Sequence, residues 1–366
     1  MKATYRLCSC RRRTLVRLAM GLAGIALAAG SGVAAGAAPG VQHDVVFDHP
    51  SPLASNEALL ERMVSPLLAA RVRTELARAH GSTATFPLDL AQERFELHVP
   101  DGEPPPDGYG LLVFVPPWES QGLPREWFPV LDRHHLIAVT AERSGNNQNV
   151  LGRRVPLALS GYENVRRRYP IDPQRVYVGG FSGGARVAMR MALAFPDVFR
   201  GALLNAGSDP LGTPEVPLPV SALFDRFERD TRLVYITGTR DENVATMDRR
   251  SHASAKSLCV SNLADVPIRG GGHEPADARS LERALDDLDA PRVEMRNASA
   301  CRARRDTAIA RAIAGVRSAI DKGAPSAAAH DLADLDARYG GLALPASTEL
   351  AARLRERGID VAAPAR

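Results

Sequence analysis

The chain has 366 residues, of which 45% are hydrophobic, and its formal net charge is +4. This length and composition allow a full hydrophobic core and exclude a fibre or a disordered tail. We expect one large domain with appended segments. The predicted boundaries separate a signal peptide at 1–37, a helical leader at 38–85, the main domain at 86–290 and a helical C-terminal extension at 291–366.

The start of the chain has the three parts of a secretory signal peptide. A basic segment is followed by the apolar stretch 18–29 and by small residues, and we expect cleavage after Ala37. Arg12 and Arg13, followed by Thr, Leu and Val, also fit a twin-arginine export signal. The alternative is an uncleaved anchor, because the charge-free run 18–38 is long enough to cross a bilayer. We therefore expect a periplasmic or secreted protein with no membrane attachment after cleavage.

Removal of the signal changes both the charge and the cysteine content. The segment before Ala38 holds six Lys and Arg and no acid, so the formal net charge changes from +4 to −2, and nucleic acid is not an expected partner. Cys8 and Cys10 leave with the signal. The remaining Cys259 and Cys301 predict one disulfide, which in the chain-entropy model stabilises the fold by about 4 kcal/mol. Two buried thiols are the alternative.

The order of the predicted elements indicates the fold class. Apolar residues at helical spacing predict a helix at 56–80, interrupted by Pro66, outside the main domain. Short apolar runs separated by helical stretches then predict a mostly parallel sheet covered by helices on both faces. After residue 290 the strand signals stop, and three helices follow. The runs lie at 111–115, 136–140, 176–179, 202–204, 233–237 and 266–268, and the late helices at 302–321, 327–338 and 348–357.

The segment Gly180-Phe181-Ser182-Gly183-Gly184 has the sequence of a nucleophile elbow. It lies directly between a predicted strand and a predicted helix, which is the context that such an elbow requires. The glycines allow a sharp turn with close backbone contacts, and the N-terminus of the helix points at a developing anion. A plain Gly/Ser turn is the alternative. We predict that Ser182 is a nucleophile.

The expected partners of Ser182 follow in the order Asp, then His, each after a predicted strand. Neutral His273 would take the serine proton, and Asp241 would orient the ring and stabilise its charged form. Activity should therefore rise with pH as the ring loses its proton. Asp241 is alternatively a helix N-cap, with Asp248 or Asp209 as the acid.

The oxyanion of the reaction needs two donors. The N–H of Gly183 is the first, because it directly follows the nucleophile. The second should come from the loop after the strand 111–115. That loop begins with two prolines, which have no N–H to donate, so Trp118 is the candidate and Glu119 the second choice.

Aromatic and amide side chains are the candidates for substrate binding. Phe181 and Trp118, together with Trp127 and Phe128, are expected to line an apolar acyl or aryl pocket, with ordinary core packing as the alternative. Asn147 and its neighbours are expected to offer polar contacts, with a plain turn as the alternative. A metal is not expected at the cluster His43, Asp44, Asp48 and His49, because a new N-terminus is usually mobile.

The run Ile171-Asp172-Pro173 with Arg175-Val176-Tyr177-Val178-Gly179-Gly180-Phe181-Ser182-Gly183-Gly184 resembles the α/β-hydrolase superfamily, and in particular the secreted polyhydroxybutyrate-depolymerase and feruloyl-esterase group. The resemblance covers roughly 95–288. It implies an α/β-hydrolase catalytic domain that cleaves a small or polymeric carboxylic ester through an acyl-enzyme on Ser182, without a cofactor. Members commonly carry His-Gly where this chain has prolines and Trp118.

Three other functions remain open on the same residues. The triad also serves acyl transfer and peptide hydrolysis, depending on what the pocket holds. The proline-filled loop also suggests a catalytically silent binding protein.

After residue 207 only the short helix 221–229 separates two strands, so we expect no large cap and a fairly open site.

Overall fold

The computed structural model describes residues 39–361, apart from positions 80, 83, 84, 86, 87, 121 and 294. The expected signal peptide, with Arg12, Arg13, Cys8 and Cys10, lies outside the described residues. Within the described ranges we find no helix whose length and hydropathy would let it span a bilayer.

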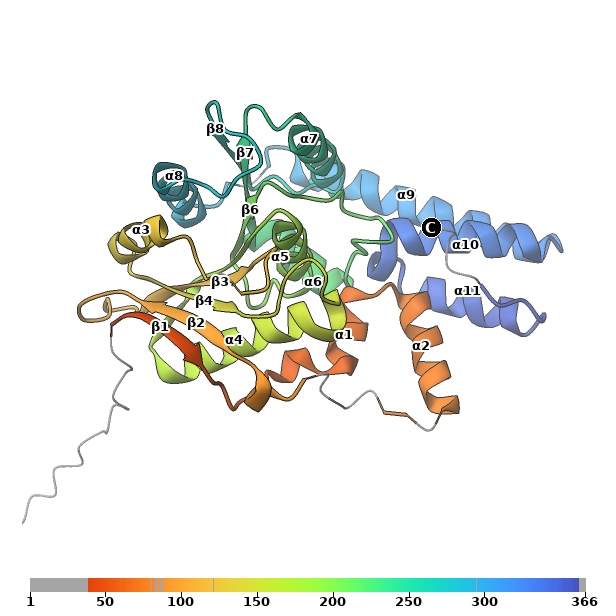
Figure 1. Ribbon diagram of the computed structural model, residues 1–366. Coiled ribbons are helices and arrows are strands. Elements are labelled where there is room, and N and C mark those ends of the chain that lie inside the picture. The colour runs from red at the N-terminus through yellow and green to blue at the C-terminus, as the bar shows by residue number, and fades with distance from the viewer. Residues whose placement is uncertain are drawn as a thin grey trace, which may run out of the picture. The chain divides into compact units, whose positions relative to one another are not determined.

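An eight-stranded sheet forms the centre of the domain (Figure 1), in the order β1-β2-β4-β3-β5-β6-β7-β8. The pairs β1–β2 and β2–β4 are antiparallel, and the other pairs are parallel. The six predicted apolar runs lie in β3 to β8. The predicted α/β-hydrolase fold is therefore confirmed. The strands are β1 (Gly40–Val45), β2 (Phe95–Val99), β3 (Tyr109–Val115), β4 (Leu136–Ala141), β5 (Ile171–Phe181), β6 (Gly201–Asn205), β7 (Arg232–Gly238) and β8 (Leu263–Ile268).

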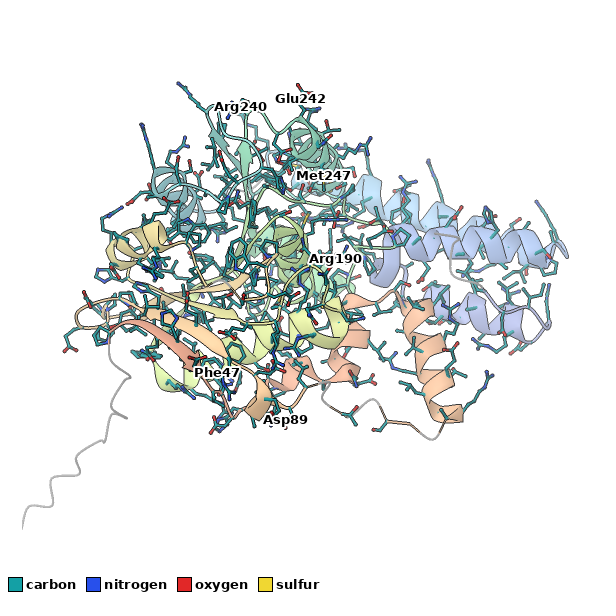
Figure 2. All side chains as sticks on the ribbon, in the orientation of Figure 1. Phe47, Asp89, Arg190, Arg240, Glu242 and Met247 are labelled. Atoms are coloured by element: carbon teal, nitrogen blue, oxygen red, sulfur yellow. A yellow bond between two sulfur atoms is a disulfide. The ribbon has the colours of Figure 1, made fainter. Side chains whose placement is uncertain are left out.

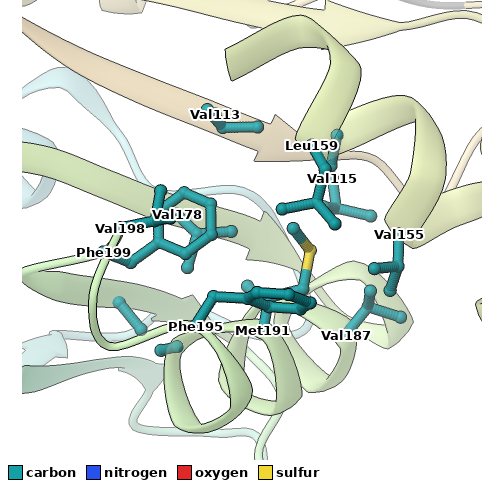
Figure 3. Packing of buried hydrophobic residues seen from close by; sticks show 14 of the residues in the cluster. Val113, Val115, Val155, Leu159, Val178, Val187, Met191, Phe195, Val198 and Phe199 are labelled. Carbon is teal, nitrogen blue, oxygen red and sulfur yellow. The ribbon is translucent and has the colours of Figure 1, made fainter. Parts of the chain in front are cut away.

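Helices cover both faces of the sheet, and the strands alternate between the two resulting cores. Leu111 and Val113 on β3 pack into one cluster, while Leu112 and Phe114 pack into the other. Figure 3 shows the first cluster, where valines of β3 and β5 meet α4 (Val155–Arg168) and α5 (Gly183–Ala194). Burial of both faces explains why the strands have continuous apolar sequences. The second cluster includes residues of α3 (Phe128–Arg133) and α8 (Ala278–Asp289).

Strand β1 was not predicted. The segment expected to be a mobile N-terminus pairs with β2 at the edge of the sheet, and Nδ1 of His43 lies 3.1 Å from a carboxylate oxygen of Glu96. His49 contacts the adjacent Asp48 instead, at 2.7 Å. In the described part of the chain, no three His, Cys, Asp or Glu are grouped so as to hold a metal ion.

The leader contains two helices where the sequence predicted one interrupted helix at 56–80. They are α1 (Asn56–Met63) and α2 (Pro66–Arg78). Pro66 begins α2 rather than breaking a longer helix, because a first helical residue needs no N–H bond and proline has its φ already fixed. Leu67 of α2 packs against the apolar cluster of the C-terminal helices.

The C-terminal extension is helical, as predicted. Helices α9 (Ala298–Asp321), α10 (Pro325–Tyr339) and α11 (Ala346–Arg355) lie side by side (Figure 1) around an apolar cluster of their own. The structure contains the predicted disulfide between Cys259 and Cys301, with 5.8 Å between the Cα atoms. It joins the segment before β8 to the start of α9. The remaining long helices are α6 (Ser221–Asp230) and α7 (Glu242–Ser257).

Candidate active site

Ser182 lies at the turn between β5 and α5. Its φ is 55° and its ψ is −121°, a strained conformation that persists only where the surrounding structure enforces it. The Ser182 N–H donates to the carbonyl of Asn205 on β6, at 2.8 Å. A Cβ atom on Gly180, Gly184 or Gly207 would overlap neighbouring backbone. The glycines of the elbow are therefore needed for close packing around the serine.

Three side chains from separate loops meet at this turn. Nε2 of His273 lies 2.8 Å from Oγ of Ser182, and Nδ1 of the same ring lies 2.6 Å from Oδ2 of Asp241. Asp241 follows β7 and His273 follows β8, so both lie where the carboxyl ends of parallel strands place reactive side chains. The Asp241 side chain is 9% exposed and the His273 side chain is 49% exposed. The ring is thus open to solvent while the carboxylate is largely shielded.

The carboxylate of Asp241 makes two contacts. Its Oδ1 accepts from the N–H of Val244, at 3.2 Å, and so caps the N-terminus of α7. Its Oδ2 faces His273. The sequence offered the helix cap and the histidine contact as alternatives, and the structure contains both, because each uses a different oxygen.

The two alternative acids have other partners. Asp209 pairs with Arg186 at 2.8 Å. Asp248 accepts hydrogen bonds from the hydroxyls of Ser208 and Thr237. Burial raises the pKa of Asp248 more than these two hydrogen bonds lower it. Both carboxylates are therefore engaged away from the histidine ring.

A buried amide anchors the loop that carries the histidine. Asn205 is fully buried. Its Oδ1 accepts from the N–H of Ala276 at 2.7 Å, and its Nδ2 donates to the carbonyl of Ile236 at 3.3 Å. The indole N–H of Trp127 donates to the Ala276 carbonyl at 2.7 Å. Trp127 is thus a core residue that holds the His273 loop, and not part of a substrate pocket, because its ring is fully buried.

The other predicted aromatic residues also pack as walls rather than facing Ser182. The rings of Phe181 and His273 are 5.2 Å apart between centroids, and those of Phe181 and Trp118 are 6.1 Å apart. Phe128 stacks on His98 at 4.7 Å. Phe181 therefore packs beside the histidine ring, and Trp118 packs against Phe181.

A cavity of about 460 Å³ lies beside Ser182. Gly183 is part of its lining, as predicted. Its described lining residues do not include Trp118, Phe181 or Asn147, for which the sequence predicts oxyanion or substrate contacts. They do include Asn146, one of the asparagines that were expected to offer polar contacts. They also include three arginines that the sequence did not single out: Arg154, Arg186 and Arg190.

Asn146 lies at the elbow, beside the residue that follows the nucleophile. Its amide lies against Gly183, where an added Cβ would overlap Oδ1 of Asn146. The Asn146 backbone N–H donates to the carbonyl of Pro117 at 3.0 Å, which ties the loop after β4 to the proline loop after β3. The run of asparagines after β4 was the sequence signal. Which of them faces the nucleophile depends on the turn geometry, which the sequence does not reveal.

Arg154 is a buried cation at the wall of this cavity. It is 3% exposed, and burial lowers its pKa to about 10. Its guanidinium donates to the carbonyls of Ser144 and Pro116, each at 2.8 Å, and of Gly183 at 3.4 Å. One side chain thus holds together the three loops that converge on the nucleophile. Nothing in the sequence around Arg154 distinguishes it from the surface arginines.

Positive charge exceeds negative charge on the α5 side of the cavity. Arg186 and Arg190 share the single carboxylate of Asp209, at 2.8 Å and 3.3 Å. Arg190 and Met247, both labelled in Figure 2, line the cavity from α5 and α7. The α5 side of the cavity thus has two guanidinium groups that share one carboxylate.

The sheet order and the nucleophile elbow define a protein with the α/β-hydrolase fold. No family model matches the chain. Over 128 residues it is 31% identical to poly(3-hydroxyalkanoate) depolymerase C of Paucimonas lemoignei. This match covers 30% of each protein, so the chain spans under a third of that curated relative. The predicted resemblance to the depolymerase group of this superfamily is therefore confirmed for that stretch.

Solved structures with similar folds include several esterases, all of low identity. Esterase 2 of Thermogutta terrifontis is 20% identical, with 55% of this chain and 87% of that chain covered and a TM-score of 0.39. A ferulic acid esterase is 14% identical, with 53% and 89% covered and a TM-score of 0.39. These scores are too low to add to the assignment of the fold, which depends on the sheet and the elbow.

Proposed function

We propose that this chain is an exported serine hydrolase that cleaves carboxylic esters through an acyl-enzyme on Ser182. The observation that carries the proposal is the continuous contact from Asp241 through His273 to Ser182, with separations of 2.6 Å and 2.8 Å. These are hydrogen-bonding distances for a base and its nucleophile. The strained elbow supports the same function, because strain at a serine of this kind is typical of a functional site.

In acylation, Oγ of Ser182 attacks the ester carbonyl while Nε2 of His273 accepts the hydroxyl proton. Asp241 accepts the hydrogen bond from Nδ1 and stabilises the positive ring. The ester C–O bond then breaks, and the alkoxide leaves with the proton from Nε2. In deacylation a water molecule gives its proton to His273 and attacks the acyl carbonyl, which releases the acid and restores Ser182. The chemistry requires no cofactor.

We infer that the oxyanion is bound by the N–H of Gly183 and the side-chain amide of Asn146. Both line the Ser182 cavity, and an asparagine amide is an established type of donor to an oxyanion. This assignment replaces the expected N–H of Trp118. Arg154 supports the arrangement, since it binds the carbonyls of Gly183 and of the proline loop.

The substrate class that we propose is a small or polymeric carboxylic ester. The 31% identity to a poly(3-hydroxyalkanoate) depolymerase supports an ester bond as the target. The disulfide supports export, because such bonds persist mainly in oxidising compartments. The signal-like start of the sequence supports the same location.

The test is hydrolysis of p-nitrophenyl esters and of a feruloyl ester by residues 38–366 and by the Ser182→Ala variant. We expect turnover by the parent protein and none above background by the variant. A fluorophosphonate should label the parent at Ser182. A folded protein that neither turns over an ester nor is labelled would favour the silent binding protein. Transfer of the acyl group to an added alcohol, or cleavage of an added peptide, would identify an acyltransferase or a peptidase.

A further inference from the structure

A second and larger cavity adjoins the cavity at Ser182. Its volume is about 640 Å³, within the range of roughly 300–1,000 Å³ that is usual for ligand sites. It lies among α2, α5, α10 and the helical turn η4 (Val150–Arg154). Val150 and Arg190 belong to the linings of both cavities. The two spaces therefore meet at these side chains.

Helix α5 begins directly after the nucleophile, and its last turns line the second cavity. Ser182, Arg186 and Arg190 are spaced four residues apart and so lie on one face. With a rise of about 1.5 Å per residue, Arg190 is about 12 Å from Ser182 along the helix. Leu193 and Ala194, on the next turn, line the second cavity. A chain whose carbonyl is at Ser182 would enter this cavity if it followed α5.

The second cavity offers apolar surface. Leu68 of α2 and Leu151 of η4 are half-buried and line it. Within the described residues, neither belongs to the three apolar clusters of the protein or to the side chains packed against them. Their apolar atoms therefore face the cavity rather than a core. Its other apolar lining residues include Met63, Leu67, Leu193 and Val216.

Several of the polar groups at this cavity have partners within the protein. Arg62 pairs with Asp197 at 2.7 Å. The Asp336 carboxylate accepts from the hydroxyl of Ser65 at 2.5 Å and from the N–H of Leu67 at 3.3 Å. These groups are therefore satisfied without a ligand, and they leave an apolar ligand as the better match for the space.

The side chains that border both cavities also offer apolar atoms. The guanidinium of Arg190 is held by Asp209 at 3.3 Å. The methylene stem of an arginine fixed in this way can cover an apolar group.

The position of the second cavity relative to His273 indicates which half of an ester would occupy it. The leaving alcohol must lie near Nε2 of His273, which protonates it. The second cavity is lined from α2, η4, α5, α10 and nearby loops, and its described lining includes neither His273 nor any residue of α7. The acyl half is the part of the ester that points away from the histidine. The cavity is therefore suited to the acyl chain and not to the alcohol.

We propose that the 640 Å³ cavity is an acyl-chain site that holds the distal part of a medium-length or long unbranched acyl group. The inference rests on the proposed function and names the acyl specificity of that same site. It gives α2 and α10 a role in selecting the substrate. A short acyl group ends in the smaller cavity at Ser182 and does not reach these helices.

The test compares p-nitrophenyl dodecanoate with p-nitrophenyl butanoate. Ala337→Trp places a large ring in the cavity from α10, where Ala337 is half-buried, and Leu68→Trp does so from α2. We expect the ratio of kcat/KM for dodecanoate over butanoate to fall roughly tenfold or more in both variants. Ala253→Trp, on the exposed face of α7, is the matched control and should leave the ratio unchanged. An unchanged ratio in both test variants would overturn the proposal.

A binding measurement separates this inference from the proposed function. The Ser182→Ala protein should bind dodecanoic acid in a calorimetric titration, and the Ser182→Ala/Ala337→Trp double variant should bind it at least about tenfold more weakly. If neither ester is hydrolysed, the proposed function fails, and this titration alone decides on the cavity. Equal binding by the two proteins would refute the acyl-chain site, whatever the catalytic result.

Discussion

The loops at the active site and the helices of the C-terminal extension are held by different kinds of interaction. At the active site, buried polar groups with fixed partners set the geometry. Asn205 connects the elbow, β7 and the His273 loop, and Arg154 connects the elbow to the loops after β3 and β4. In the extension, α9, α10 and α11 pack mainly through an apolar cluster. A disulfide ties them to the segment before β8, and two arginines of α9 bind the buried carboxylate of Glu228 on α6.

This difference separates the chemistry from the selection of substrate. Hydrogen bonds are directional, so a network of them holds reacting atoms to within a narrow range of positions. Apolar packing tolerates exchange of one side chain for another of similar volume. The wall of the second cavity contributed by α2 and α10 can therefore change its shape while the triad keeps its geometry.

The largest expected effect concerns the active-site loops and tests the role of Ser182. Ser182→Ala should lower kcat by roughly 10⁴-fold or more, because loss of the nucleophile removes the covalent route. Ser257→Ala, a matched change at an exposed serine of α7, should leave kcat unchanged. The measurement is hydrolysis of p-nitrophenyl butanoate by both variants. Full activity in Ser182→Ala would rule out the acyl-enzyme.

The second prediction tests how the extension is attached. The disulfide closes a loop of 42 residues, and its reduction should lower the free energy of unfolding by about 4 kcal/mol in the chain-entropy model. Denaturation in guanidinium chloride, with and without reductant, measures the change. Butanoate turnover in dilute denaturant should outlast the loss of helical signal from the extension after reduction. Simultaneous loss of both would show that the two regions unfold as one unit.

The third prediction concerns the oxyanion. Asn146→Ala should lower kcat by about 10²–10³-fold with little change in KM, because the lost donor acts mainly in the transition state. Asn147→Ala is the matched comparison one residue away, outside the described lining of the Ser182 cavity. If Asn147→Ala has the larger effect, the assignment of the second oxyanion donor to Asn146 is wrong.

Much of the fold was predictable because it leaves strong local signals. Strands buried on both faces have continuous apolar sequences, and the elbow has its own glycine pattern, so β3 to β8 and the turn at Ser182 could be identified from the sequence. Strands β1 and β2 were both missed. Strand β1 lies at an edge and is half exposed, and Glu96 and His98 interrupt the apolar sequence of β2. The role of Pro66 was misjudged because a proline can either end a helix or begin one.

The finer features of the site depend on contacts that local sequence does not encode. Asn146 and Asn147 are adjacent and of the same type, and only the path of the turn places one of them at Gly183. Tryptophan is a residue type that often lines pockets, yet the indole N–H of Trp127 donates to a carbonyl 149 residues away. Arg154 is likewise indistinguishable by sequence from an exposed arginine, since its burial depends on three separate loops.

The smallest expected effect lies at the end of α8, the last helix before the C-terminal extension. Asp289 is the last residue of α8 and faces β5. Burial alone would raise the pKa of this carboxyl, but the nearby His134 ring and the hydrogen bonds from the Arg175 and Tyr177 side chains hold the pKa well below its usual range. A carboxyl with a lowered pKa in the folded state stabilises the fold above its unfolded pKa of about 3.9, and this contribution is lost as the pH falls further.

The free energy of unfolding falls as the pH drops from about 5 to the acid limit of folding, and Asp289→Asn should therefore make this fall smaller. Denaturation at a series of pH values measures the change. The effect should be modest, because the Asp289 side chain is 30% exposed and solvent screens its contacts. Asp286→Asn, three residues earlier on the same helix and 68% exposed, is the matched control. Equal pH dependence in both variants and the parent would show that the contacts of Asp289 contribute nothing to acid stability.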